Sequence, residues 1–160
     1  LPKQTTIAYM PRKRSVEATY IRDMFRFTYP DFRHWQWRPI HDKTEAETAQ
    51  LMGEAAVFLS LSRLEGFGLT PLEAMSADCI VAGFTGIGGR EYANDSNGFW
   101  AEEDDFPACI EQLKMAVDLV AKGSVISRTV YHNACRRTLQ AYTPATFKAA
   151  VLAAWAEILG

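Results

Sequence analysis

Apolar and polar positions follow one another along this chain in a way that predicts strands and helices in turn. Short runs that are continuously apolar, or that alternate with polar residues, predict strands at residues 5–10, 32–38, 55–62, 79–84 and 97–100. Helical spacing and helix-start signals predict helices at residues 15–29, 43–56, 71–77, 106–122, 124–142 and 143–159. This order predicts an α/β fold: a Rossmann-like, doubly wound parallel sheet in a single domain, residues 1–160.

Capping signals predict where two of the helices begin. Ser15 is expected to cap the first helix. The apolar residues at helical spacing within that helix are Val16, Tyr20, Met24 and Phe27. Thr44 and Glu47 have the spacing of a capping box, which predicts the start of the second helix.

The acidic run at residues 102–105 admits two interpretations. Carboxylates two positions apart can bind a divalent metal. The run also directly precedes the helix predicted at residues 106–122, where acidic side chains interact favourably with the helix dipole. We favour the second interpretation, so the sequence predicts neither a metal site nor a cofactor.

A glycine-rich segment follows the fourth strand, at residues 85–92. It contains Gly86 and Gly88, but the third glycine of a dinucleotide-binding fingerprint is missing, because position 91 is Glu. We therefore expect a tight turn with Glu91 near the start of a short helix.

Composition and charge narrow the class of protein further. No apolar run approaches the length needed to span a bilayer. Residues 1–43 carry nine Lys and Arg against four Asp and Glu, a basic region too diffuse to predict nucleic-acid binding. Three widely spaced cysteines favour a reducing compartment, hence a cytoplasmic protein, and the apolar neighbours of Cys79 and Cys109 predict that these two are core residues. Because the chain begins at Leu1 rather than Met, we expect a fragment or a processed product.

The chemistry concentrates in the turn between the third strand and the next helix, residues 65–73. Gly66 and Gly68 would let a ligand approach the backbone closely, and a helix N-terminus suits a phosphate. Arg12, Lys13 and Arg14 follow the first strand, at the edge of an open α/β sheet where ligands bind. From the residues alone, a nucleotide site and a purely structural turn remain alternatives.

Glu73 likewise has two explanations. With Thr70 as N-cap and Pro71 at the first helical position, Glu73 would complete a capping box. A carboxylate at this place could instead accept hydrogen bonds from the two hydroxyls of a ribose. Recognition of the base is expected near residues 39–42.

Residues 65–75 resemble the glutamate, seven residues, glutamate motif of retaining GT-B glycosyltransferases of the glycosyl transferases group 1 type. Both glutamates, both glycines and the following Leu-Glu-Ala-Met match, and residues 86–92 are similar to the family's glycine-glycine-x-x-glutamate turn. The resemblance covers about residues 5–120. It implies a C-terminal donor-binding domain, with the N-terminal acceptor domain absent from this chain.

The resemblance also implies a role for individual residues. Glu65 would be the catalytic residue, against the donor sugar, and Glu73 would bind the ribose. Backbone amides near the diphosphate or sugar would come from Gly66, Phe67, Gly68, Leu69 and Thr70. Arg12 and Lys13 would neutralise the diphosphate, although the spacing departs from the family's and leaves Arg14 as a third candidate.

The implied reaction transfers a hexose from a nucleoside-diphosphate sugar to an acceptor, with retention and without a cofactor. The partners are then the nucleoside-diphosphate sugar and the missing N-terminal domain of the same enzyme, and peripheral membrane association of the full-length protein is compatible with this. We expect the isolated chain to bind donor but to transfer sugar poorly. The alternatives are a non-catalytic nucleotide-binding or scaffold domain, a nucleotide-sugar epimerase and a sugar phosphorylase.

Overall fold

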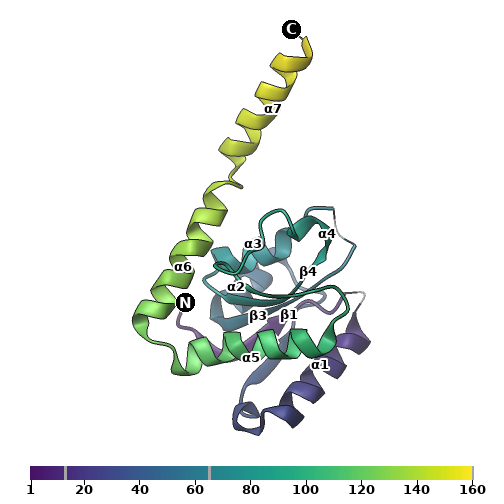
Figure 1. Cartoon of the computed structure of the whole chain (residues 1–160), viewed down its shortest axis with the longest axis vertical. Helices are drawn as coiled ribbons and strands as arrows, with labels where there is room; N and C mark the ends of the chain where they lie inside the picture. Colours follow the sequence, from purple (N-terminus) through teal and green to yellow (C-terminus); the bar gives the residue numbers. More distant parts are fainter. Residues whose placement is uncertain (13, 65, 160) are drawn as a thin grey trace.

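The fold is a five-stranded, all-parallel sheet with helices on both faces (Figure 1). The computed structural model describes residues 1–12, 14–64 and 66–159, with residues 158 and 159 described by backbone alone. The strand order is β2-β1-β3-β4-β5. The strands are β1 (Gln4–Tyr9), β2 (Gln36–Pro39), β3 (Ala55–Ser62), β4 (Ile80–Thr85) and β5 (Phe99–Ala101). The predicted doubly wound α/β fold is confirmed.

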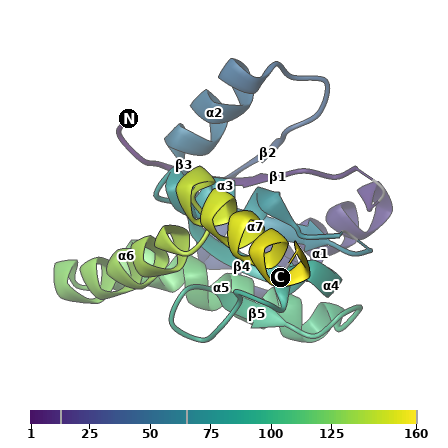
Figure 2. The ribbon, with the colours of Figure 1, turned by 90° about the horizontal axis from the view of Figure 1, so that it is seen from above.

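The helices connect consecutive strands or follow the last one. They are α1 (Ser15–Thr28), the 3-10 helix η1 (Pro30–Phe32), α2 (Glu45–Glu54), α3 (Leu69–Ser76), α4 (Gly86–Gly89), α5 (Phe106–Lys122), α6 (Val125–Gln140) and α7 (Pro144–Leu159). α1 packs against α5, and α3 packs against α6. Because parallel crossovers are right-handed, α1 lies on one face of the sheet and α2 and α3 on the other. Figure 1 shows α2 and α3 above the strands and α1 and α5 below them, and Figure 2 looks onto the sheet from above, with α2 and α5 near its opposite edges.

The core is centred on β3, in which every residue is buried. Its continuous apolar run is typical of a parallel strand that is covered on both faces. Cys79, Cys109 and Cys135 are free and buried, which confirms the core location predicted for Cys79 and Cys109. Burial raises the pKa of these thiols to about 11 for Cys79, about 12 for Cys109 and about 11 for Cys135, so they remain protonated at neutral pH.

In α1, the apolar residues noted for their helical spacing are not the ones that are fully buried. Its buried residues are Ala18, Ile21 and Phe25, whereas Val16 and Phe27 are 77% and 76% exposed. Both sets have helical spacing, so the periodicity could not decide which stripe faces the sheet. The predicted cap is wrong, because the N-cap is Arg14 and its side chain makes no capping hydrogen bond.

Two other predictions near helix starts have different outcomes. The strand predicted at residues 32–38 is shorter, because η1 extends to Phe32 and β2 begins only at Gln36. Pro30 favours this turn, since its φ is already helical and it has no N–H to leave unpaired. The capping box of Thr44 and Glu47 is confirmed: the Glu47 N–H donates to Thr44 Oγ1 at 3.2 Å and the Thr44 N–H to Glu47 Oε2 at 2.9 Å.

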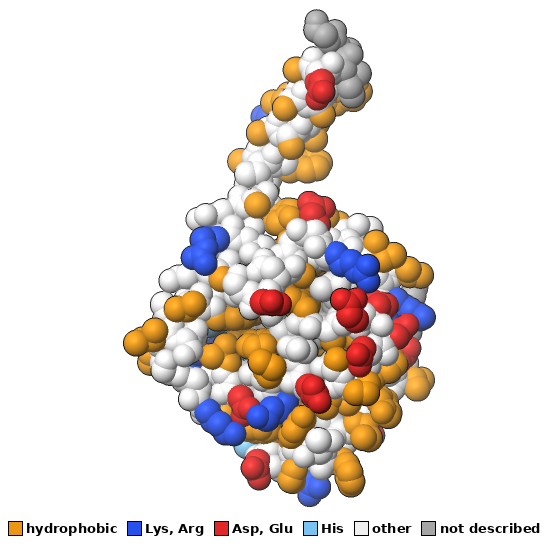
Figure 3. All heavy atoms as spheres, viewed as in Figure 1, with side chains coloured by type: hydrophobic (Ala, Val, Ile, Leu, Met, Phe, Trp, Pro, Cys, Tyr) orange, Lys and Arg blue, Asp and Glu red, His pale blue; other side chains and the backbone are white. Residues whose placement is uncertain are grey.

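The last helix, α7, extends away from the body of the molecule (Figure 1). Phe147 and Trp155, which the spacing places on one face, are 72% and 55% exposed. Figure 3 shows apolar side chains along this projection. No helix among the described residues combines the length and apolar character needed to cross a membrane.

Candidate functional site

The candidate site lies where the order of the strands reverses direction. The chain passes from β1 through α1 to β2 on one side, and from β3 through α3 to β4 on the other. β1 and β3 are neighbours, so the loops that follow them meet at the carboxyl edge of the sheet. Open α/β sheets bind ligands in the crevice at such a switch point.

An outer cavity of about 460 Å³ opens at this point. Its lining residues are Arg12, Gly66, Phe67, Gly68, Leu69, Thr70 and Glu73. Seven of the nine predicted site residues therefore meet in one cavity, although they come from two loops more than fifty positions apart. The other two, Lys13 and Glu65, lie outside the residues that the structure describes.

The start of α3 differs from the predicted capping box. Gly68 is the N-cap, in the left-handed conformation (φ 73°, ψ 62°), and no side chain caps the helix. Thr70 is thus the second helical residue rather than the cap, because the left-handed glycine turns the chain into the helix earlier than expected. Among the described residues, no side chain accepts a hydrogen bond from the N–H groups of Leu69 and Thr70, so these groups are available to a ligand.

Glu73 loses its structural explanation as a result. It is exposed on α3, and across the described ranges of the chain its carboxylate has neither a hydrogen bond nor an ion pair. It lines the outer cavity and also the groove between α2 and α3. Its carboxylate can therefore accept hydrogen bonds from a ligand.

The glycine-rich segment after β4 packs against the loop at residues 66–68. α4 occupies Gly86–Gly89, so the short helix precedes Glu91 and does not begin near it, which corrects the prediction. A Cβ atom at Gly88 would lie 2.6 Å from the Cα of Phe67. Glycine is needed at this position because α4 and the 66–68 loop approach each other too closely for a side chain.

Tyr92 holds the same loop from the side. Its ring is 4% exposed, and its hydroxyl donates a hydrogen bond of 2.5 Å to the carbonyl of Gly68. The rings of Phe67, Tyr92 and Tyr142 form a cluster with centroid separations of 5.3 to 6.0 Å. Sequence reasoning missed this tyrosine, although it directly follows Glu91 in the glycine-rich segment.

Arg14 is a buried arginine with two acidic partners. Its side chain is only 2% exposed, and its guanidinium forms ion pairs with Glu103 and, at 2.8 Å, with Asp104. The guanidinium carbon also lies 4.9 Å from the centre of the Phe84 ring. The acidic run is thus explained by this arginine and by Asp105, which caps α5 by accepting from the Ala108 N–H at 3.0 Å.

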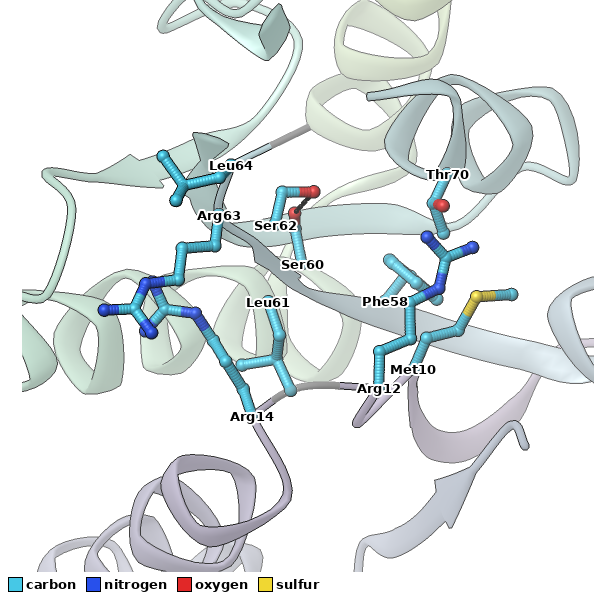
Figure 4. A pocket seen from close by; sticks show the side chains of 10 residues that line it. All are labelled: Met10, Arg12, Arg14, Phe58, Ser60, Leu61, Ser62, Arg63, Leu64 and Thr70. Carbon is cyan, nitrogen blue, oxygen red and sulfur yellow. Dashed lines mark hydrogen bonds between the residues drawn. The ribbon is translucent and has the colours of Figure 1, made fainter. Parts of the chain in front are cut away.

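An inner cavity of about 280 Å³ adjoins the outer one at the ends of β1 and β3 (Figure 4). Arg12 and Thr70 line both cavities, whereas Arg63 lines the inner cavity but not the outer one. Arg63 is a second residue that the sequence analysis missed, because it stands outside the glutamate motif. Within the described segments, no group of three or more His, Cys, Asp or Glu could hold a metal ion.

Comparison with known proteins shows the family of this chain. The chain is 34% identical over 122 residues to an alpha-1,6-glucosyltransferase of Actinobacillus pleuropneumoniae serotype 7 (strain AP76). The matched segment is 74% of this chain but 37% of that protein, so the chain spans little more than a third of this relative's length. Residues 40–128, which include β3, the 66–68 loop and α3, match the family Glycosyl transferases group 1. The chain therefore belongs to the glycosyl transferases group 1 family.

Proposed function

We propose that this chain is the donor-binding domain of a retaining glycosyltransferase that uses a nucleoside-diphosphate sugar. The observation that carries the proposal is the meeting of Arg12 with residues 66–73 in one cavity at the switch point of the sheet. This cavity is lined by the cation of Arg12, by the N-terminus of α3 and by the Glu73 carboxylate. These groups suit a phosphate beside a diol, which is the arrangement in a nucleotide.

The diphosphate is held by two kinds of donor in this proposal. The N–H groups of Leu69 and Thr70, in the first turn of α3, belong to residues that line the cavity, and they carry the positive end of the helix dipole. The guanidinium of Arg12 adds a planar pair of donors that matches phosphate oxygens. Gly66 and Gly68 have no side chains to keep the ligand away from this backbone.

Glu73 binds the ribose hydroxyls from its place one turn into α3. Lys13 and Glu65 keep the roles that the family resemblance implies, in neutralising the diphosphate and contacting the donor sugar. The base lies toward residues 39–42, at the end of β2. Because β2 and β1 are neighbours, this segment borders the same edge of the sheet.

The reaction breaks the bond between the anomeric carbon of the sugar and the β-phosphate oxygen, and the electron pair stays on that oxygen. The acceptor hydroxyl oxygen bonds to the anomeric carbon on the same face, and its proton passes to the departing phosphate oxygen. Negative charge grows on the departing diphosphate, so the cations and the helix dipole stabilise the transition state more than the ground state.

The acceptor binds a separate N-terminal domain of the full-length enzyme. The relative that matches this chain is much longer and is named an alpha-1,6-glucosyltransferase, which supports transfer of a hexose. On this proposal the isolated chain binds donor but has little transferase activity. Robust turnover by these 160 residues alone would contradict it. The three free, buried cysteines support a reducing, cytoplasmic location.

Calorimetric titration with UDP, GDP and ADP tests the proposal. We expect one of the three to bind. Glu73→Gln should weaken that binding about tenfold with no change in melting temperature, because the carboxylate is exposed and does not cap α3. Glu111→Gln is the matched control, an exposed glutamate on α5. Failure of all three nucleotides to bind would favour the scaffold alternative.

A further inference from the structure

We propose that Arg63 binds the β-phosphate of the donor, so that the diphosphate is clamped between arginines from both sides of the switch point. This rests on the proposed function and adds a residue to it. Arg12 follows β1 and Arg63 follows β3, and both side chains line the inner cavity (Figure 4). The two strands are neighbours in the sheet, which brings the two loops together.

The backbone of Arg63 is held in place, although its side chain is exposed. Its carbonyl accepts a hydrogen bond of 3.1 Å from the Ile87 N–H at the start of α4. A Cβ atom at Gly86 would lie 2.8 Å from the same carbonyl oxygen, so α4 packs directly against it. The side chain therefore extends from a fixed point, which lowers the entropy lost when it meets a ligand.

The charge of Arg63 is not used within the described part of the chain. Its guanidinium has no hydrogen bond or ion pair there, unlike Arg14, whose charge Glu103 and Asp104 oppose. Three arginines nevertheless line one cavity of about 280 Å³. An anion in that cavity would be attracted to the guanidinium of Arg63.

Thr70 is a second and independent pointer to a ligand. The residue is 8% exposed, it lines both cavities, and its hydroxyl has no hydrogen bond within the described residues. Its oxygen is accessible from the cavity, where it can form a hydrogen bond with a ligand. Thr70 stands in the first turn of α3, so a phosphate there would also meet the N–H groups of the helix.

The order of the lining residues assigns the two phosphates. Glu73 lines the outer cavity and not the inner one, Arg63 lines the inner and not the outer, and Arg12 and Thr70 line both. A nucleotide whose ribose meets Glu73 has its α-phosphate near Arg12 and Thr70. Its β-phosphate then enters the inner cavity, where Arg63 is available.

The test compares nucleoside diphosphates with monophosphates by calorimetric titration, using UDP and UMP, GDP and GMP, and ADP and AMP. For the base that binds, Arg63→Gln should weaken the diphosphate at least tenfold and the monophosphate less than twofold. Arg12→Gln should weaken both, because Arg12 lines both cavities. Arg63→Lys should recover part of the diphosphate affinity. Arg137→Gln on α6 is the control for loss of an exposed cation.

Each outcome has a distinct meaning. If the wild-type chain binds none of the nucleotides, the proposed function and this inference are both wrong. If the wild type prefers the diphosphate and Arg63→Gln leaves that preference unchanged, only the role of Arg63 is wrong. Equal weakening of both nucleotides would also overturn it. Melting temperatures of all variants check that the fold is intact.

Discussion

The Tyr92 hydroxyl donates its hydrogen bond to the carbonyl of Gly68, the left-handed residue at which α3 begins. The donor and acceptor are 2.5 Å apart, and the two residues stand 24 positions apart in the chain. The bond joins the turn after β4 to the loop after β3. It therefore helps to set the direction in which the α3 N-terminus points into the candidate site.

Tyr92→Phe should remove this bond and keep the ring packing. We expect a loss of about 1 kcal/mol in the free energy of unfolding, because the Gly68 carbonyl loses a buried donor. Nucleotide affinity should fall as well, since the loop loses a restraint. Tyr142→Phe is the control, because its hydroxyl has only a 3.4 Å contact with Glu91. Equal effects of the two changes, measured by urea unfolding and titration, would refute the role of the Tyr92 bond.

Arg14→Met should be much more destabilising than loss of a surface ion pair. The arginine is buried, and its two acidic partners would lose their counter-charge. We expect a loss of about 3 kcal/mol in urea unfolding. The matched control is Arg22→Met, whose pair with Asp23 at 2.8 Å lies on the surface and should cost at most about 1 kcal/mol. Similar losses for both variants would show that Arg14 is not a structural anchor.

Lys3 ties together the ends of two helices on one face of the sheet. Its ammonium group donates to the carbonyls of Met52 at 3.1 Å, Ala55 at 2.8 Å and Ala77 at 2.6 Å. These carbonyls lie at the C-terminal ends of α2 and α3, where acceptors are unsatisfied and the dipole is negative.

Lys3→Met should therefore lower the free energy of unfolding by about 1–2 kcal/mol, a modest figure because the residue is partly open to solvent. Lys148→Met, on the exposed helix α7, should change it little. Urea unfolding of both variants measures the difference. Equal stability of the two would mean that the three hydrogen bonds of Lys3 contribute nothing net.

His132 should make the protein less stable in mild acid. Burial lowers its pKa, and Arg136, Lys3 and Arg128 act in the same direction, while Asp78, with Oδ1 at 3.8 Å from Nδ1, opposes them. The folded state therefore releases the proton more readily than the unfolded state, whose histidine titrates near pH 6.5. Between the two pKa values the unfolded state binds more protons, so stability falls as the pH falls through that range.

Melting temperatures between pH 7.5 and pH 5 test this. The decline should be smaller in His132→Gln than in the wild type. His34→Gln, which changes an exposed histidine, should leave the decline as it is in the wild type. A wild-type decline that survives in His132→Gln would assign the pH dependence to other groups.

Predictions that rest on local chemistry are confirmed where nothing distant competes with them. The capping box of Thr44 and Glu47 forms at the exposed start of α2. Thr70 and Glu73 show the same pattern but form no box, because Gly68 adopts a left-handed conformation that Tyr92 and the packing of α4 support. The same local signal therefore has opposite outcomes in the two helices.

The sequence by itself determined the order of strands and helices, the parallel sheet and the loop that holds the glycine motif, because these depend on hydrophobic period and turn residues. Only the tertiary structure decided which stripe of α1 faces the sheet and which arginine is buried. It also brought Tyr92 to the loop from another segment and placed Arg12 and Arg63 around one cavity. Periodicity fixes the spacing of side chains along an element, whereas docking and long-range hydrogen bonds fix the direction in which they point.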